Sequence, residues 1–183
     1  MKARKILDKR RTDLLKFSVS KDETRLHLNS IWHDDKLGAL VSTNGHHATI
    51  LKSRYSPELS NKLIDPNTFQ IIHREPVKIA AVIPSKFQTT LNFTIEKHHF
   101  VNTKNRPTHA HFFNDGTVSI GLLKDLGDKE GRLFTVNAAY LKHLVGGTYA
   151  VGTNNELSPV AFSLDHECLE LANDIYIIMP LKV

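Results

Sequence analysis

The stretch Leu40-Val-Ser-Thr-Asn-Gly-His-His-Ala-Thr-Ile-Leu51 contains two runs of apolar and β-branched residues on either side of a polar corner, Thr43-Asn-Gly-His46. An Asn-Gly pair between such runs is a strong hairpin signal, because a type I′ turn needs positive φ at both central residues. The sequence therefore predicts two antiparallel strands with a tight turn at Asn44-Gly45. Whether the corner has a further role depends on the rest of the chain.

Length and composition indicate a globular protein. The chain has 183 residues, of which 40% are hydrophobic and 23% charged, so it can bury one well-packed core. Its apolar runs, such as 175–181, are too short to span a bilayer, and the basic N-terminus lacks the apolar region of a signal peptide. The single cysteine, Cys168, excludes an internal disulfide and a Cys-based zinc knuckle. A cytoplasmic protein is expected.

The positive charge is concentrated at the N-terminus. Residues 1–16 carry seven bases and two acids, 7 − 2 = +5, which equals the formal net charge of the whole chain. Clustered Lys and Arg gain affinity for polyanions by releasing counterions. The alternative interpretation is a solvated, solubilising helix face.

Periodicity predicts two helices. The first covers 7–15, where Leu7, Arg11, Leu14 and Leu15 form a narrow apolar stripe and the other bases fall largely elsewhere. The second covers 138–145, with Asn137 as N-cap and two glycines at its end, and a flexible stretch is expected to follow through residue 155.

Strands account for most of the remaining pattern. Apolar alternation or short apolar runs between turn residues predict strands at 25–32, 37–42, 47–52, 77–84, 91–96, 111–113, 117–123, 133–136, 160–164, 167–171 and 174–181, with a short edge strand at 2–6. Residues 1–53 and 132–183 then share one order, β-α-β-β-β, which suggests an internal duplication.

Three segments carry a resemblance to a known family. The first runs from Phe17-Ser-Val through Arg25-Leu-His-Leu-Asn-Ser-Ile to Leu40-Val-Ser-Thr-Asn-Gly-His-His-Ala, the second is Leu133-Phe-Thr-Val-Asn-Ala-Ala-Tyr-Leu-Lys-His-Leu, and the third is Tyr176-Ile-Ile-Met-Pro-Leu-Lys-Val. They resemble the bacterial DNA polymerase III β subunit, the sliding clamp. The family pattern has Asp where this chain has Asn44, and Arg where it has His47.

The resemblance implies an α+β fold, a DNA-clamp-like domain of two β-α-β-β-β halves with antiparallel sheets and a β-rich insertion. A single domain over 1–183 is expected, with halves 1–53 and 132–183 and the insertion at 54–131. The alternative is one and a half domains, with 78–131 completing a first domain.

The resemblance also implies a role on DNA. Clamps close into a ring with basic helices toward the duplex, and sliding needs phosphate contacts without base recognition. The residues expected to bind double-stranded DNA are Lys5, Lys9, Arg10, Arg11, Lys16 and Lys142. A one-domain protomer would have to form a homo-oligomer to close such a ring.

Clamps bind short peptides of polymerases and repair proteins in an apolar pocket. Carried over by resemblance, the walls of that pocket are Thr43, Gly45, His46, His47, Ile178, Met179, Pro180, Leu181, Lys182 and Val183. A Met beside Pro and Leu suits varied partners. The alternative is that 179–181 is a final strand that packs on the core.

Enzymatic alternatives have weak support. His109 and His111 have the spacing of two metal ligands on one strand face, but no Cys pair or HExxH motif accompanies them. Nucleotide-binding and nucleophile motifs are absent from the sequence. The sequence thus predicts a non-enzymatic replication processivity factor without cofactor or metal. The alternative is a monomeric clamp-domain relative that binds or mimics clamp partners.

Overall fold

The computed structural model describes residues 9–22, 24–25, 27–52, 59–72, 89–100, 109–121 and 130–181. Contacts divide the chain into two compact units: unit 1 comprises residues 1–83 and 173–176, and unit 2 comprises residues 84–172 and 177–183. Each unit is described separately below. The division of the chain into two halves and an insertion at 54–131 stays a prediction.

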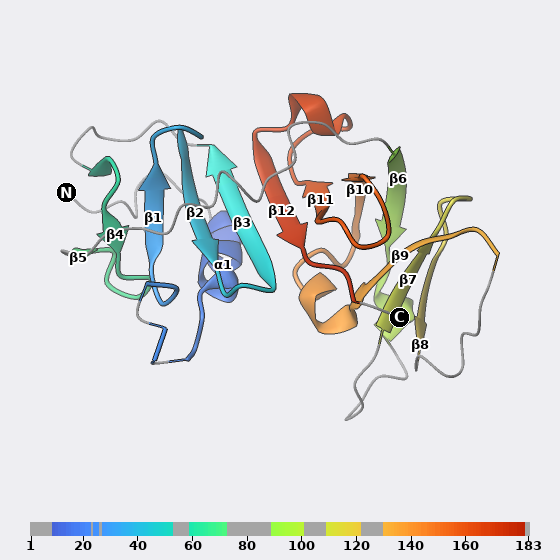
Figure 1. Cartoon of the computed structure of the whole chain (residues 1–183), viewed down its shortest axis with the longest axis horizontal. Helices are drawn as coiled ribbons and strands as arrows, with labels where there is room; N and C mark the ends of the chain where they lie inside the picture. Colours follow the sequence, from blue (N-terminus) through green and yellow to red (C-terminus); the bar gives the residue numbers. More distant parts are fainter. Residues whose placement is uncertain are drawn as a thin grey trace. The chain divides into compact units, whose positions relative to one another are not determined.

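The described residues of unit 1 form one α-helix and an antiparallel sheet. Its elements are α1 (Lys9–Ser18), β1 (Ile31–Asp34), β2 (Ala39–Thr43), β3 (His47–Lys52), β4 (Leu63–Ile64) and β5 (Ile71–Ile72). The strand order is β5-β4-β1-β2-β3, followed by the first residues of β12 (Asp174–Ile178). Helix α1 packs against β2 and β3 (Figure 1).

The described strands of unit 2 belong to two antiparallel sheets. Its strands are β6 (Thr89–Ile95), β7 (His109–Phe113), β8 (Val118–Gly121), β9 (Arg132–Asn137), β10 (Gly147–Thr153), β11 (Val160–Ser163) and the end of β12. In the described part of unit 2, the short 3₁₀ helices η3 (Lys97–Phe100), η4 (Ala138–Leu141) and η5 (Leu169–Leu171) connect them. One sheet has the order β12-β11-β10-β6, and the other has the order β8-β7-β9.

Each unit has its own apolar core. In unit 1 the apolar stripe of α1 supplies Leu14 and Leu15, and the sheet supplies Trp32 and Leu51, all at most 2% exposed. Burying such side chains supplies the main favourable term for folding, about 25 cal/mol per Å² of apolar surface.

The core of unit 2 is built from aromatic rings. Phe112 on β7 contacts Phe93 of β6, Phe134 of β9 and Phe162 of β11, with ring centroids 5.0, 4.6 and 5.9 Å away. Its ring therefore packs against strands of both sheets. Such edge-to-face and stacked pairs add to the area that they bury.

The predicted fold class is confirmed. The structure is α+β with antiparallel sheets, and the hairpins at 39–52 and 109–121 form where turn residues predicted them. The first helix extends to Ser18, beyond its predicted end at residue 15. The strand expected at 25–32 starts only at Ile31, and residues 27–30 form turns and bends.

The second β-α-β-β-β segment is correct in order and wrong in detail. The stretch expected to be flexible contains β10 (147–153), whereas 167–171, expected as a strand, ends in the 3₁₀ helix η5. The helix expected at 138–145 is the 3₁₀ turn η4, capped by the Asn137 side chain at the Ala139 N–H as predicted. The two glycines in 147–153 weaken the strand signal of the sequence, so β10 was not predicted. In the structure, seven residue pairs with β6 hold this strand in place.

Some predicted elements lie outside the described residues, namely the edge strand at 2–6 and the strand at 77–84. In the part of the chain that the structure describes, no helix is long and apolar enough to cross a membrane.

Candidate functional site

Helix α1 has a buried face and a basic face. Leu14, Leu15 and Ser18 are buried against the sheet, while Lys9 and Lys16 are exposed on the opposite side. Arg10 is exposed as well, and the half-buried Asp13 stands between Lys9 and Lys16 on the helix surface. Lys142, exposed in unit 2, follows η4, and Lys5 lies outside the described residues.

Arg11 has a structural contact that the sequence did not reveal. Its guanidinium lies 2.9 Å from both Asp174 carboxylate oxygens, through Nε and Nη2, and Nη2 also donates to the Lys52 carbonyl at 2.5 Å. Asp174 is 8% exposed. Because charge-assisted, two-point contacts of this kind are strong, Arg11 fastens α1 to β12 and to the end of β3.

Lys16 lies over an aromatic ring of the β4–β5 loop. Its Nζ is 5.6 Å from the centroid of the Phe69 ring, a cation–π distance. The backbone N–H of Thr68 is the main cause that lowers the pKa of Asp65 in the same loop, and the charge of Lys16 contributes. Lys16 thus lies close to an aromatic ring and to an acid of the β4–β5 loop.

The hairpin corner differs from the predicted type I′ turn. Among its residues only Gly45 has positive φ, +91°, and the central pair is Gly45-His46 rather than Asn44-Gly45. Positive φ at the first central residue alone is the pattern of a type II′ turn. The Asn44 side chain explains the shift, since its Oδ1 accepts from the N–H groups of His46 and His47 at 2.9 and 3.1 Å.

A chain of hydrogen bonds connects the corner to α1. Asn44 Nδ2 is 2.9 Å from His47 Nε2, and His47 Nδ1 is 3.1 Å from Ser18 Oγ. Ser18 Oγ is 2.7 Å from Thr49 Oγ1, which donates to the Leu14 carbonyl at 3.2 Å. We call this chain, Asn44–His47–Ser18–Thr49–Leu14, the corner relay.

The His47 ring is enclosed by unit 1. It is 3% exposed, stacks on Phe17 with centroids 4.8 Å apart, and lies 5.5 Å from the Tyr176 ring of β12. Sequence reasoning placed His47 in a pocket wall but missed Ser18 and Thr49. Ser18 lies three and four residues beyond the buried Leu15 and Leu14, and that spacing was the available signal.

The residues predicted to form the peptide pocket fall into two groups. Thr43, Gly45, His46 and His47 belong to the corner in unit 1, and 178–181 belong to unit 2. The predicted strand at 174–181 ends early, at Ile178, and 179–181 are half-buried, with the Leu181 N–H donating to the Thr135 carbonyl at 2.9 Å. Lys182 and Val183 lie outside the described residues. A pocket formed by both groups stays a prediction.

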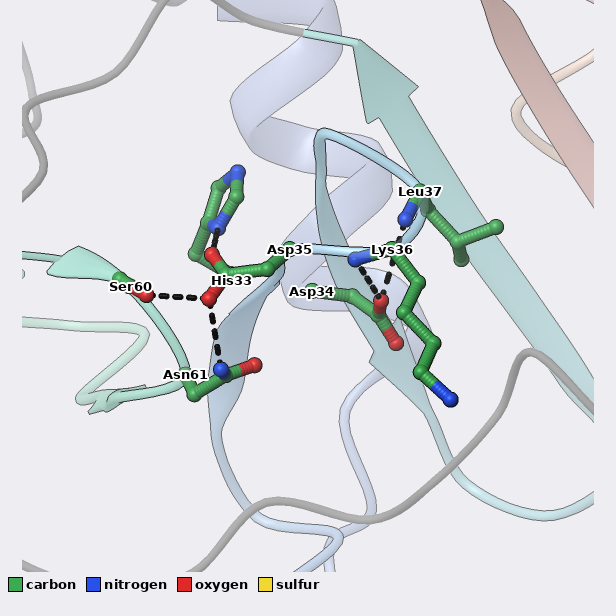
Figure 2. Close-up of polar contacts among 7 residues, drawn as sticks. All are labelled: His33, Asp34, Asp35, Lys36, Leu37, Ser60 and Asn61. Carbon is green, nitrogen blue, oxygen red and sulfur yellow. Dashed lines mark hydrogen bonds and ion pairs between the residues drawn. The ribbon is translucent and has the colours of Figure 1, made fainter.

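A second polar cluster surrounds Asp35 at the β1–β2 turn (Figure 2). Its carboxylate accepts from His33 Nδ1 at 3.1 Å, Asn61 Nδ2 at 2.6 Å and the Ser60 hydroxyl. In a catalytic triad the histidine lies between the serine and the acid. Here the acid lies between the other two, so His33 does not activate Ser60, and the cluster instead ties the β1–β2 turn to the residues before β4.

His33 gives a pH prediction. Burial lowers the pKa of His33 below its ordinary value of 6.5, against the opposing effect of Asp35. The unfolded chain therefore takes up the proton first, and the free energy of unfolding should fall as the pH drops below about 6.5. Urea titrations from pH 7.5 to 5 should show a smaller fall for His33→Asn, which keeps a donor to Asp35. Equal slopes for the two proteins would contradict this assignment.

The histidine pair of the sequence lies where the spacing placed it. His109 and His111 are two residues apart on β7, with ring centroids 6.5 Å apart, and His111 Nδ1 is 3.0 Å from Thr135 Oγ1. Among the described residues, no group of three or more His, Cys, Asp or Glu side chains could hold a metal ion. The pair therefore has no third ligand of these types there.

Comparison with known proteins identifies the fold. No protein-family model matches the sequence, and no curated protein matches it. Among solved structures, the DNA polymerase III β subunits of Borrelia burgdorferi and Thermotoga maritima superpose with TM-scores of 0.65 and 0.63 at 15% and 16% identity. The β subunit of Streptococcus pyogenes DNA polymerase superposes with a TM-score of 0.65 at 11% identity.

The similarity covers nearly all of this chain but less of its neighbours. It covers 95% of this chain in each case, and 61%, 63% and 63% of the three neighbours. The chain thus spans less than two thirds of their length. The resemblance in its terminal segments is confirmed for the fold: this chain has the fold of the DNA polymerase III β subunit, the bacterial sliding clamp.

Proposed function

We propose that this protein is a non-enzymatic, sliding-clamp-like factor that encircles duplex DNA as a homo-oligomer and supports replication as a processivity factor. The observation that carries this proposal is the clamp fold over 95% of the chain, combined with a helix whose exposed side is basic. A clamp needs affinity for duplex DNA without recognition of the base sequence. A basic helix face supplies that affinity through contacts to the phosphates.

The contacts within unit 1 indicate which Lys and Arg side chains of α1 bind DNA phosphates in the proposed complex. Lys9, Arg10 and Lys16 are exposed on α1, whereas Arg11 is committed to Asp174. We therefore assign phosphate binding to Lys9, Arg10 and Lys16, with Lys5 and Lys142 as further candidates. Arg11 supports binding by holding the helix in place.

Ring closure would need more than one copy of the chain. The chain spans less than two thirds of each clamp neighbour, so one copy supplies only part of a clamp-sized ring. In the proposed oligomer, the corner and the C-terminal tail are the walls of a site for peptides of a polymerase or repair protein. These walls can come from one copy or from adjacent copies.

The basic face is tested by charge removal. The triple variant Lys9→Ala, Arg10→Ala, Lys16→Ala should bind duplex DNA more weakly, and the slope of log affinity against log salt should fall by about one unit per lost contact. Fluorescence anisotropy with a labelled duplex at several salt concentrations measures both quantities.

A matched control variant distinguishes the effect of the basic face of α1 from the effect of the total charge of the protein on DNA binding. Lys36, Lys62 and Lys97 are exposed and lie outside α1, so their triple alanine variant removes the same charge. The control should keep the salt slope of the parent protein. Equal losses in the two triple variants would contradict a specific DNA-facing helix.

A second candidate agrees with the clamp fold, which by itself does not require a ring: a monomer that binds or mimics clamp partners without encircling DNA. A monomeric mass at high concentration, unchanged DNA association of the α1 variant, and binding of a clamp-recognition peptide would together support it over the ring.

A further inference from the structure

Two carboxylates lie within the basic surface of unit 1, and the first of them is on α1. Lys9, Asp13 and Lys16 are spaced i, i+4 and i+7, so they follow one another along the same side of the helix. That side is opposite to the buried Leu14 and Leu15. Lys9 and Lys16 are exposed and Asp13 is half-buried, so a negative charge interrupts the row of cations.

The second carboxylate, Asp65, belongs to the loop between β4 and β5. Its Oδ1 accepts from the backbone N–H groups of Asn67 and Thr68 at 2.8 and 2.7 Å, and from the Thr68 hydroxyl at 3.1 Å. These bonds, with the Thr68 N–H first, and the charge of Lys16 keep the pKa of Asp65 below its ordinary value of 3.8. Asp65 is therefore ionised at neutral pH, and its carboxylate is fixed in position.

Phe69 connects this loop to the helix. Its side chain is 5% exposed, and the Lys16 Nζ lies 5.6 Å from the centroid of its ring. The cation–π contact and the charge of Asp65 thus both act on the Lys16 amino group from the loop. Lys16 therefore has one carboxylate a helical turn away on α1, that of Asp13, and another on the β4–β5 loop.

Carboxylates at such positions oppose the binding of DNA. A phosphate that approaches Lys16 also approaches Asp13 and Asp65, and their charges repel it. Each carboxylate also partly neutralises a neighbouring lysine, so fewer counterions are released when DNA binds. A protein that encircles DNA stays on it by topology and needs only weak phosphate contacts, whereas strong contacts have to be broken at every step along the duplex.

We propose that Asp13 and Asp65 are counter-charges that limit the affinity of the DNA-binding face and so allow the protein to slide along DNA. This inference rests on the proposed function, because it requires that the basic side of α1 faces DNA. Removing either carboxylate should raise the affinity for duplex DNA and slow diffusion along it.

The variant Asp13→Asn tests the first counter-charge, because the amide has nearly the same shape as the carboxylate and carries no charge. Fluorescence anisotropy with a labelled duplex at low salt should show an affinity at least about threefold higher than that of the parent protein. The gain should shrink as the salt concentration rises, since salt screens the repulsion. Asp13→Glu, which keeps the charge, should bind DNA as the parent protein does.

The variant Asp65→Asn tests the second counter-charge and keeps an acceptor oxygen for the N–H groups of the loop. It should raise the affinity in the same salt-dependent way. The fluorescence of the buried Trp32 in urea checks that each variant is folded. Glu156→Gln is the matched control, because Glu156 is exposed in unit 2 and its replacement removes the same charge outside α1. Its gain in affinity should be much smaller.

The effect on movement is measured on single DNA molecules whose ends are both blocked. Labelled Asp13→Asn protein should diffuse along the duplex at least about twofold more slowly than the parent protein. Equal gains in affinity in Asp13→Asn and Glu156→Gln would overturn the inference, and so would an Asp13→Asn protein that diffuses as fast as the parent.

The triple variant Lys9→Ala, Arg10→Ala, Lys16→Ala distinguishes failure of this inference from failure of the proposed function. If the triple variant loses affinity for DNA but Asp13→Asn gains none, the DNA-facing helix stands and the counter-charges are overturned. If neither variant changes DNA binding, α1 does not face DNA, and the proposed function fails together with the inference.

Discussion

Replacing Arg11 with alanine should lower the free energy of unfolding of unit 1 by about 2–3 kcal/mol. The substitution removes the Arg11 guanidinium from the Asp174 carboxylate, which is 8% exposed, and removes a donor from the Lys52 carbonyl. Removing one partner of a fully buried ion pair costs more, but the Arg11 side chain is 23% exposed, which moderates the loss. Trp32 is the only tryptophan of the chain and is buried in unit 1, so its fluorescence in urea reports this unfolding.

Two companion variants make the result specific. Lys9→Ala removes a charge from the same helix without a buried partner and should change stability by less than about 0.5 kcal/mol. Adding Asp174→Asn to Arg11→Ala should recover part of the loss, because the amide carries no charge to leave unpaired. An Arg11→Ala variant as stable as Lys9→Ala would mean that the Arg11–Asp174 ion pair between α1 and β12 contributes nothing to the free energy of unfolding.

Replacing Phe112 with alanine should destabilise unit 2 by about 3–5 kcal/mol. The side chain is fully buried and touches aromatic rings on β6, β9 and β11, so its removal leaves a cavity between the two sheets of the unit. Amide hydrogen exchange of β7 and β10 at pH 7 measures the loss directly, since both strands belong to unit 2.

Phe112→Leu provides the graded control. It keeps an apolar side chain of nearly the same volume and should cost less than half as much as the alanine variant. Exchange rates in β7 and β10 that stay unchanged in Phe112→Ala would show that this ring is not the centre of the unit 2 core.

Patterns among neighbouring residues predicted the helix and the hairpins correctly. The helix near residues 7–15 and the hairpins at 39–52 and 109–121 follow from periodicity and turn chemistry, which need only neighbouring residues. The sequence placed Arg11 both in the apolar stripe of the helix and among the DNA-binding residues, and these are two different roles. Its partner, Asp174, is 163 positions away, and no local pattern could show which assignment the contact favours.

The errors have physical causes. β10 contains two glycines and follows a third, Gly146, so its composition indicated flexibility, while its pairing with β6 comes from distant residues. At the corner, the Asn44 side chain replaces the backbone acceptor and moves the turn by one residue, an effect that turn statistics do not register.

The two departures from the clamp pattern belong together in the structure. Asn44 and His47, which stand at these two positions, form a hydrogen bond with each other at 2.9 Å. The sequence showed both substitutions, but their mutual contact and the link from His47 to Ser18 required the folded structure.

The central claim, that the protein encircles DNA, is tested most directly by topological retention. The protein is allowed to thread onto linear duplex DNA, both ends are then blocked with a bulky protein, and the complex is washed at a salt concentration that screens phosphate contacts. A ring should remain on the end-blocked DNA as an oligomer, measured by light scattering, and should be lost from the same DNA with free ends. Equal loss from blocked and free-ended DNA, with a monomeric mass throughout, would contradict encirclement.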